Sequence, residues 1–413
     1  MGEERFARYM AAFNEEPPVS IRLNPTAFPD PSKGKGERCR RMESPLSLEG
    51  AREASVPWCP LGYYLPKRPN FTFDPLLHAG CYYVQDAASM FIHHILNGGL
   101  RMKNEDFFTI HSSLKLLDLC AAPGGKSTCA IAALPEGSEL WSNEPVHSRA
   151  SILSENIQKW GYPNCHVTNN YPHDYVRSGM LFDIILCDVP CSGEGMFRKD
   201  PATIGEWSPQ NVEKCWQLQR DIVSEAWQCL KPGGILIYST CTFNTKENEE
   251  NVRWIVETFD ADIVPVETLP EWNITDSLLP GFDAPVYRFI PGITRSEGLF
   301  VCVLRKSGEW KEEKGKKNTI RQTQGLHILP PFTPTPSLHE ADLDYTTAIA
   351  YLRGEAIVLP QSTPHGIITV SFMGYPLGQV KNIGTRANNL YPKEWRIKST
   401  HIPKEYEAIL RLT

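Results

Sequence analysis

The sequence predicts an α/β protein with a doubly wound, mostly parallel sheet at its centre, a small module before it and a smaller mixed or mainly β domain after it. Short apolar runs alternate with helical patterns between residues 114 and 306. Strands that alternate with helices of this length form right-handed crossovers in a parallel sheet. The chain of 413 residues is also too long for one ordinary core, so two or three domains are expected.

The composition excludes several classes of protein. A net charge of -6 argues against a protein that coats nucleic acid by bulk electrostatics, so any such binding needs local basic patches. The twelve cysteines are spread along the chain without a CxxC pair of metal-ligand spacing. No secretory signal begins the sequence, and no apolar stretch reaches the roughly 18 residues of a membrane span. We therefore expect a cytoplasmic monomer with reduced cysteines, no metal and no membrane contact.

The first 77 residues are expected to form an N-terminal module on the substrate side, with a solvated loop at residues 31–41. From Gln85, the residues Ala88, Phe91, Ile92 and Ile95 recur at helical spacing, which predicts a helix leading into the next domain.

The central domain is expected over residues 78–306. Its buried strands are predicted at residues 114–120, 139–144, 182–189 and 233–240, with a weaker one at 164–169, and the runs at 261–266 and 298–306 are expected to close the sheet. Helical patterns fill the spaces between them. A polar, lysine-rich linker at 307–327 then leads to a domain at 328–413.

The segment LLDLCAAPGGKST (116–128) predicts a strand, a loop of small residues and a helix, an arrangement that presents backbone amides to a ligand at the carboxyl edge of a sheet. Cys120 stands where a phosphate-binding P-loop needs glycine, and GxGxxG is absent. Glu144 ends the next strand, 19 residues after Gly125. That spacing fits a carboxylate holding the ribose of an adenosyl cofactor. A surface acid at a strand end is the other interpretation.

Two cysteines follow buried strands, in DVPCSGEG (188–195) and YSTCTF (238–243). A lone buried cysteine is usually structural. Because the carboxyl ends of parallel strands meet at one edge of the sheet, Cys191 and Cys241 are both predicted to face the cleft beside the cofactor loop.

The motifs CAAPGGK, DVPCSGEGMFRKDP and YSTCTFNTKENEENV resemble those of the Nol1/Nop2/Sun family of RNA 5-methylcytosine methyltransferases. GEGMFRKDP and the tail resemble the RsmF-type bacterial rRNA branch, and the similarity runs through most of residues 78–306. The resemblance implies a Rossmann-like class I methyltransferase sheet and S-adenosylmethionine as cofactor. The implied cofactor contacts are Cys120, Ala121, Ala122, Pro123, Gly124, Gly125, Lys126, Glu144 and Asp188.

One motif departs from the family's pattern. Relatives have an acidic residue after the third strand to hold the adenine amine, whereas this chain reads TNNYPHDY and has Tyr171 at the matching place. Asn170 and Asp174 are the possible substitutes, so the adenine contact stays open.

The chemistry of cytosine methylation suits the two thiols. Carbon 5 of cytosine is a poor nucleophile, so a thiolate that adds to C6 activates it. We assign this role to Cys241 as a hypothesis. Cys191 is assigned the removal of the C5 proton, which releases Cys241, and Asp188 the stabilisation of charge near N3.

Residues outside the cysteine motifs are candidates for RNA contact. SIRLNP (20–25) and GCYYVQDAASM (80–90) resemble family elements beside the catalytic domain, although ordinary surface and helix-cap roles remain open for them. Residues 374–413 resemble a PUA-like RNA-binding end and carry seven Lys or Arg against three Asp or Glu, although a solvated basic face is the other interpretation. The candidates are Arg22, Asn24, Gln85, Asp86, Arg198, Lys199, Lys381, Tyr391, Lys393, Trp395 and Arg396.

The resemblance favours small-subunit (16S) rRNA as substrate, either free or within a ribosomal particle. The alternatives are tRNA cytosine-5 methylation, a ribosome-assembly factor that binds S-adenosylmethionine without turnover and, least favoured, a small-molecule methyltransferase.

Overall fold

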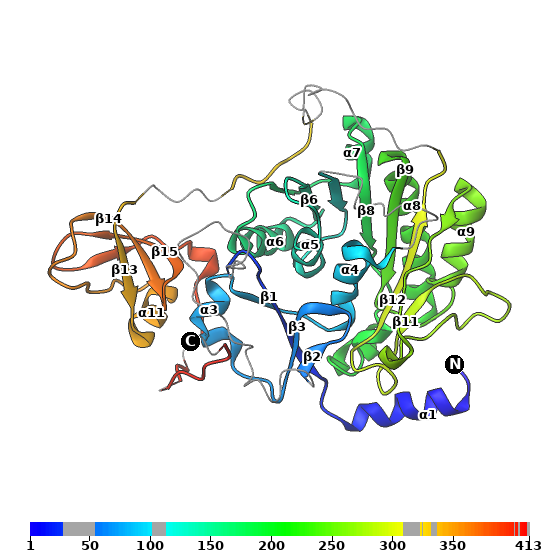
Figure 1. Ribbon diagram of the computed structural model, residues 1–413, viewed down its shortest axis with the longest axis horizontal. Helices are drawn as coiled ribbons and strands as arrows, with labels where there is room; N and C mark the ends of the chain where they lie inside the picture. Colours follow the sequence, from blue (N-terminus) through cyan, green and yellow to red (C-terminus); the bar gives the residue numbers. More distant parts are fainter. Residues whose placement is uncertain are drawn as a thin grey trace.

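The computed structural model describes residues 1–27, 54–100, 113–308, 323, 325–331, 337–399, 401–403 and 405–410. In this part of the chain, three sheets follow one another along the sequence (Figure 1). The predicted loop at residues 31–41 and most of the predicted linker at 307–327 lie outside the described residues.

The N-terminal module begins with helix α1 (Glu3–Ala11) and contains an antiparallel sheet of order β2-β3-β1-β4. Its strands are β1 (Val19–Leu23), β2 (Ser55–Val56), β3 (Cys59–Leu65) and β4 (Tyr82–Val84), and α3 (Pro75–His78) precedes β4. Because β4 pairs with β1, this sheet extends past residue 77, where the sequence predicted the module to end.

The predicted helix after Gln85 is present as three short helical pieces. They are a 3-10 turn (Ala88–Met90), α4 (Phe91–His94) and a π turn (Ile95–Gly99). The four residues that predicted it are all buried, and they pack into the core beneath the central sheet.

The central sheet has the order β10-β12-β9-β8-β5-β6-β7, and β11 pairs with β12. Its strands are β5 (Lys115–Asp118), β6 (Glu139–Asn143), β7 (Cys165–Thr168), β8 (Phe182–Asp188), β9 (Leu230–Thr240), β10 (Asp262–Ile263), β11 (Tyr287–Phe289) and β12 (Leu299–Arg305). Strands β5 to β9 run parallel, as predicted, and β12 runs antiparallel to β9.

Helices cover both faces of this sheet, which explains why its central strands are continuous apolar runs. Residues of α4, α5 (Gly125–Ile131) and α6 (His147–Trp160) pack into the core on one face. Residues of α7 (Pro172–Ser178), α8 (Pro209–Cys229) and α9 (Glu249–Phe259) pack on the other. The longest of them, α8, is capped by Ser208, whose side chain accepts a hydrogen bond from the backbone N–H of Asn211.

The C-terminal domain contains β13 (Glu340–Leu343), α11 (Tyr345–Leu352), β14 (Gly366–Phe372), β15 (Tyr375–Asn382) and β16 (Ala387–Asn389). It packs directly against the N-terminal module, with α11 beside α3 (Figure 1). One apolar cluster contains Leu76 and Tyr82 from the module and Ile349 and Leu352 from the domain. The two parts therefore share a core.

Candidate active site

Three neighbouring strands end at one edge of the central sheet and bring the predicted site residues together. Asp188 is the last residue of β8, and Cys241 follows the end of β9 directly. The pairing of Asp188 with Ser239 aligns these two strand ends. The loop after β5 leads to the same edge, because Lys126 at the start of α5 reaches Asp188.

The two cysteines are adjacent. The Sγ atoms of Cys191 and Cys241 lie 3.3 Å apart, and the backbone N–H of Cys241 donates to the sulfur of Cys191 at 3.4 Å. Both residues are partly buried. The prediction that both thiols face one cleft agrees with this geometry.

The acidities of the two thiols differ because they share a hydrogen bond. Donation from Cys191 lowers the pKa of Cys241 below its usual value, with Lys126 adding to this effect against the cost of burial. The same hydrogen bond, together with burial, raises the pKa of Cys191 well above its usual range. Of the two thiols, Cys241 is therefore the one that ionises more readily.

Asp188 is held from two sides. Its carboxylate pairs with the ammonium of Lys126 at 2.8 Å and accepts a hydrogen bond from the hydroxyl of Ser239 at 2.7 Å. A charged, oriented carboxylate thus stands next to the cysteine pair.

Two glutamates that the sequence analysis missed fasten the two cysteine loops to each other. Glu194, just after Cys191, accepts from the backbone N–H groups of Phe243 and Asn244 at 2.8 and 2.9 Å. Glu247 is fully buried and accepts from the backbone of Ser192 at 3.0 Å. The signal in the sequence was the presence of acids within both motifs, GEG and TKENEE, although nothing there named their partners.

The predicted cofactor loop has a conformation that requires glycine. Gly124 caps the start of α5 with a φ of 111°, in the region that side chains avoid. A Cβ added at Gly125 would come within 3.3 Å of the Tyr83 ring. Gly124 and Gly125 therefore let the loop from Cys120 to Lys126 adopt a backbone shape at the sheet edge that side chains at these two positions would hinder.

Two carboxylates flank this loop. Glu144 is buried, accepts from the backbone N–H of Val146 and pairs with Arg149 at 3.2 Å. Asp118, which the sequence analysis did not single out, ends β5 and is completely buried. Burial raises the pKa of Asp118 to about 7, and one of its oxygens has no hydrogen-bond partner among the described residues. Such an oxygen is suited to a donor group on a ligand.

The candidates for the adenine contact differ in their surroundings. Asn170 is buried, donates to the carbonyl of His327 and accepts from the backbone N–H of the same residue. Asp174 accepts from the backbone N–H of Tyr171 and so caps α7. The ring of Tyr171 is 61% exposed.

Two predicted RNA contacts in the N-terminal module are wrong, because both side chains are buried and paired inside the protein. Arg22 is fully buried and donates to Gln85 at 2.8 Å and to Thr128 of α5 at 2.6 Å. Asn24 donates to the carbonyls of Gly80 and Trp160. Arg22, with Gln85, thus packs against the start of α5, and Asn24 joins the end of β1 to the end of α6.

Asp86 fixes the turn that leads into the 3-10 helical piece Ala88–Met90. One of its oxygens accepts from the backbone N–H of Ala88 at 3.0 Å, and the other accepts from that of Glu297 at 3.1 Å.

Arg198 is also anchored inside the protein rather than at the surface. Its side chain is 6% exposed and forms a double hydrogen bond with Glu297, which corrects the prediction that it contacts phosphates. Its neighbour Lys199 is exposed, as such a contact requires.

The C-terminal candidates divide in the same way. Tyr391 is 3% exposed, so the prediction that it stacks on bases is wrong. Trp395 is partly buried beneath the ammonium of Lys159, and Arg396 donates to the carbonyl of Tyr391. The other candidates, Lys381 and Lys393, are exposed.

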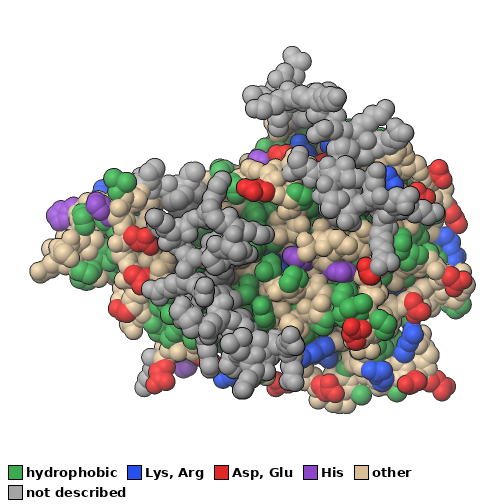
Figure 2. All heavy atoms as spheres, viewed as in Figure 1, with side chains coloured by type: hydrophobic (Ala, Val, Ile, Leu, Met, Phe, Trp, Pro, Cys, Tyr) green, Lys and Arg blue, Asp and Glu red, His purple; other side chains and the backbone are tan. Residues whose placement is uncertain are grey.

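Acidic and basic side chains are interspersed along the lower and right-hand rim of the face in Figure 2. Among the described residues, no cluster of three or more His, Cys, Asp or Glu side chains could hold a metal ion. No helix in the described part of the chain is long and apolar enough to cross a membrane.

Three family profiles match successive parts of the chain. Residues 1–87 match the N-terminal domain of 16S rRNA methyltransferase RsmF, residues 106–305 match 16S rRNA methyltransferase RsmB/F, and residues 339–397 match the methyltransferase RsmF PUA domain.

The chain is also similar to curated proteins named ribosomal RNA small subunit methyltransferase F. It is 35% identical over 257 residues to that of Pectobacterium carotovorum, covering 61% of this chain and 51% of the relative. It is 36% identical over 275 residues to that of Aliivibrio salmonicida, covering 63% and 55%. The matches thus span about half the length of these relatives.

Solved structures confirm the predicted fold. A methyltransferase homologue from Pyrococcus horikoshii superposes with a TM-score of 0.56 at 24% identity, covering 73% of this chain and 91% of that one. NSun6 from the same organism, solved with SFG, gives 0.56 at 19% identity, covering 75% and 96%.

Proposed function

We propose that the chain, which matches the profiles of the RsmB/F family of 16S rRNA methyltransferases in three successive parts, transfers a methyl group from S-adenosylmethionine to carbon 5 of a cytosine in small-subunit rRNA. The observation that carries the proposal is the pair of thiols 3.3 Å apart at the edge of the sheet where the cofactor loop ends. A methyltransferase acting on a more nucleophilic atom has no need of two such thiols.

The described residues fit the methyl donor. The loop Cys120–Lys126, the buried Glu144 and the unpaired oxygen of Asp118 supply backbone amides and acceptors on one edge of the sheet. When bound there, S-adenosylmethionine supplies an electrophilic methyl group. The domain divisions at residues 306 and 327 remain part of this proposal, with the PUA-like end taken as an RNA-binding domain, whereas the first division falls after β4 and not at residue 77.

Cys241 is the proposed nucleophile because its thiolate form is favoured. Its sulfur forms a bond to C6 of cytosine, and the electron pair of the C5–C6 double bond moves toward C5 and N3. Asp188, held by Lys126 and Ser239, is the proposed group near N3: its carboxylate accepts a hydrogen bond from N3, and stabilises the charge there, once N3 has taken up a proton. After C5 has gained its methyl group, loss of the C5 proton restores the double bond and breaks the bond from sulfur to C6.

Cys191 is the proposed base for that last proton. It starts as the thiol that donates to Cys241, so it must lose its own proton before it can accept another. N3 of the cytosine gains electron density when Cys241 adds to C6, which makes it an acceptor for the proton of Cys191. N3 gives this proton up to water when the C5–C6 double bond is restored, so the methylated base ends neutral. The same thiol then favours the anionic form of Cys241 at the start and promotes its release at the end.

The test is methyl transfer from labelled S-adenosylmethionine to separate rRNA and tRNA pools. We expect labelled rRNA with the wild type, no label with Cys241→Ala, and a denaturation-resistant protein–RNA adduct with Cys191→Ala. Cys165→Ala, which changes a half-buried cysteine on β7, is the matched control and should retain activity.

Each other outcome decides against part of the proposal. Labelling of tRNA alone would show that the substrate is tRNA and not rRNA. Full activity of Cys241→Ala would remove the covalent mechanism. A wild type that binds the methyl donor and transfers nothing to any RNA would point to an assembly factor without turnover.

A further inference from the structure

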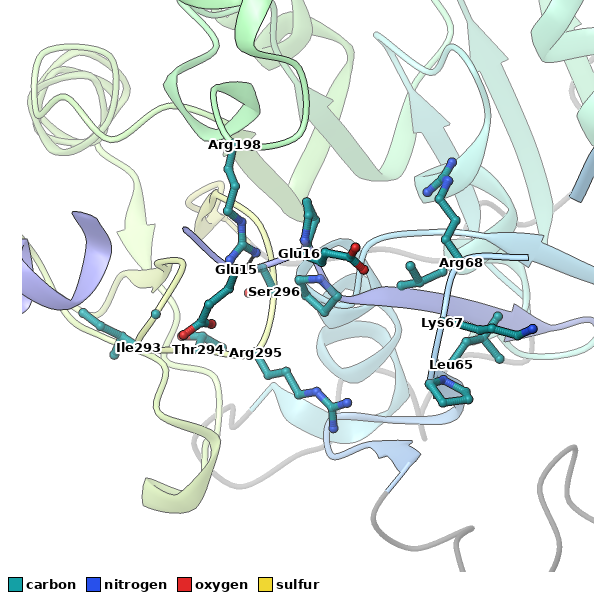
Figure 3. A pocket seen from close by; sticks show the side chains of 15 residues that line it. Glu15, Glu16, Leu65, Lys67, Arg68, Arg198, Ile293, Thr294, Arg295 and Ser296 are labelled. Carbon is teal, nitrogen blue, oxygen red and sulfur yellow. Dashed lines mark hydrogen bonds between the residues drawn. The ribbon is translucent and has the colours of Figure 1, made fainter. Parts of the chain in front are cut away.

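A polar pocket of about 420 Å³ lies where the N-terminal module meets the central domain (Figure 3). Its walls come from residues 15–19, 65–68 and 292–296, and from Arg198. Its volume lies in the range of small-ligand sites. The three segments lie outside the cysteine motifs, and Arg198 alone comes from one of them, seven residues after Cys191.

A chain of direct contacts connects the wall of the pocket to the loop that carries Cys241. Arg198 lines the pocket and pairs with Glu297, next to Gly298. Gly298 packs so closely on Gly195 that a Cβ on Gly195 would lie 2.8 Å from its Cα. The backbone N–H of Gly195 in turn donates to the carbonyl of Cys241 at 2.7 Å. A strand of substrate bound in the pocket is thus held at a set position relative to the thiols.

Two exposed arginines of the pocket are oriented by aromatic rings. The guanidinium of Arg295 lies 4.1 Å from the centre of the Tyr64 ring, whose hydroxyl donates to the backbone carbonyl of Arg295 at 2.7 Å. The guanidinium of Arg68 lies 5.6 Å from the centre of the Phe71 ring. An arginine stacked on a ring can still direct the N–H groups at its edge to a phosphate, and often does so with two parallel hydrogen bonds.

The pocket also contains the carboxylates of Glu15 and Glu16, and Figure 3 shows Glu16 between Arg198 and Arg68. Carboxylates repel a simple anion, so the pocket is poorly suited to free phosphate. A ribonucleotide matches both kinds of group, because its phosphate accepts hydrogen bonds and its 2′-hydroxyl donates one. The buried hydroxyl of Ser296, on the same wall, has no hydrogen-bond partner among the described residues.

We propose that this pocket binds a ribonucleotide of the RNA strand that carries the target cytosine, with Arg68 and Arg295 on its phosphates and Glu16 on a ribose 2′-hydroxyl. The proposal rests on the proposed function only in taking that strand as the substrate. The sequence predicted a phosphate contact at Arg198, which is buried and paired with Glu297. The proposal assigns that contact to two exposed arginines of the same pocket instead.

The first test measures binding of a single-stranded RNA oligonucleotide, without methyl donor, over a series of salt concentrations. Each lost phosphate contact should reduce the slope of log affinity against log salt by about 0.7. We therefore expect Arg68→Gln with Arg295→Gln to make the slope shallower by about 1.4, and to weaken binding at low salt about tenfold.

The matched control is Arg177→Gln with Arg253→Gln, which removes the same charge from exposed arginines on α7 and α9. If both double variants change the affinity and its salt dependence equally, the loss reflects the overall charge of the protein, and the proposal is overturned. Thermal unfolding of all variants checks that the exposed substitutions leave the fold intact.

The second test compares RNA with DNA of the same sequence. The wild type should bind RNA more tightly than DNA. Glu16→Ala should reduce the ratio of RNA affinity to DNA affinity, because it removes the contact to the 2′-hydroxyl. The change in bulk charge affects both affinities alike, so it cancels in this ratio. An unchanged ratio would overturn the contact to the 2′-hydroxyl. These binding results do not depend on methyl transfer, so a wild type that binds as expected but methylates no RNA would overturn the proposed function and leave the pocket standing.

Discussion

Cys191 and Cys241 each change the acidity of the other across the 3.3 Å between their sulfur atoms. A thiolate is stabilised by a donor that points at it, and its pKa falls accordingly. Because Cys191 donates, the pKa of Cys241 lies below its usual value. Removing this donor must therefore raise the pKa of Cys241.

We expect Cys191→Ala to shift alkylation of Cys241 to higher pH, since only the thiolate reacts. The measurement is the rate of iodoacetamide labelling of the peptide that contains Cys241, followed by mass spectrometry from pH 6 to about pH 10. Cys165→Ala should leave this profile where it is in the wild type. An unshifted profile in Cys191→Ala would mean that Cys191 does not act on Cys241.

For single residues, the sequence correctly predicted which side chains meet when they directly follow strands. It failed for side chains whose partners lie far away along the chain. Cys191 and Cys241 were predicted to meet because strand ends converge. Arg22 and Tyr391 were expected at the surface, where such polar side chains usually lie. Their partners, such as Thr128 for Arg22, come from segments that no local pattern connects to them.

Among the elements, α9 and β11 are joined by a fully buried ion pair. Glu249 in the first turn of α9 pairs with Arg288 of β11, and Arg288 also donates to the carbonyl of Phe243, two residues after Cys241. Removing one partner of such a pair leaves a charge buried without compensation. This pair thus couples the stability of the fold to the position of the loop that follows β9.

Arg288→Met should lower the free energy of unfolding by about 3–5 kcal/mol, because Glu249 is left unpaired. Adding Glu249→Leu should recover about half of that loss, since the double variant buries no charge. Urea unfolding of both single variants and the double variant measures the coupling. A double variant as unstable as the sum of the singles would contradict the assignment.

The elements themselves were largely predictable. Continuous apolar runs marked the strands from β5 to β9, because helices cover them on both faces. The antiparallel direction of β12 and its place beside β9 could not be read from composition. The helix after Gln85 ends in a π turn in which Gly98 adopts a φ of 97°, a local choice that the spacing of apolar residues does not report.

For the whole molecule, the shared core of the N-terminal module and C-terminal domain makes one prediction. Leu76→Ala in α3 should cost about 2–5 kcal/mol, as expected for a fully buried leucine. It should also speed proteolytic cleavage within residues 337–399. The control Leu338→Ala, at a leucine that is 99% exposed, should change neither. Cleavage that stays slow in Leu76→Ala would show that the domain does not depend on the module.

The sequence predicted the three parts and their order, but it gave no indication that the first and last parts pack together. Tyr406 donates to Asp74 across 332 positions of the chain, a separation that no periodicity can reveal.

This packing also limits how such proteins can recombine. A chimaera that exchanges only residues 328–413 with a relative brings a foreign surface against Leu76 and Tyr82. A chimaera that carries the N-terminal module along with that tail keeps both halves of the shared core. The two ends of the chain are therefore best inherited as a pair.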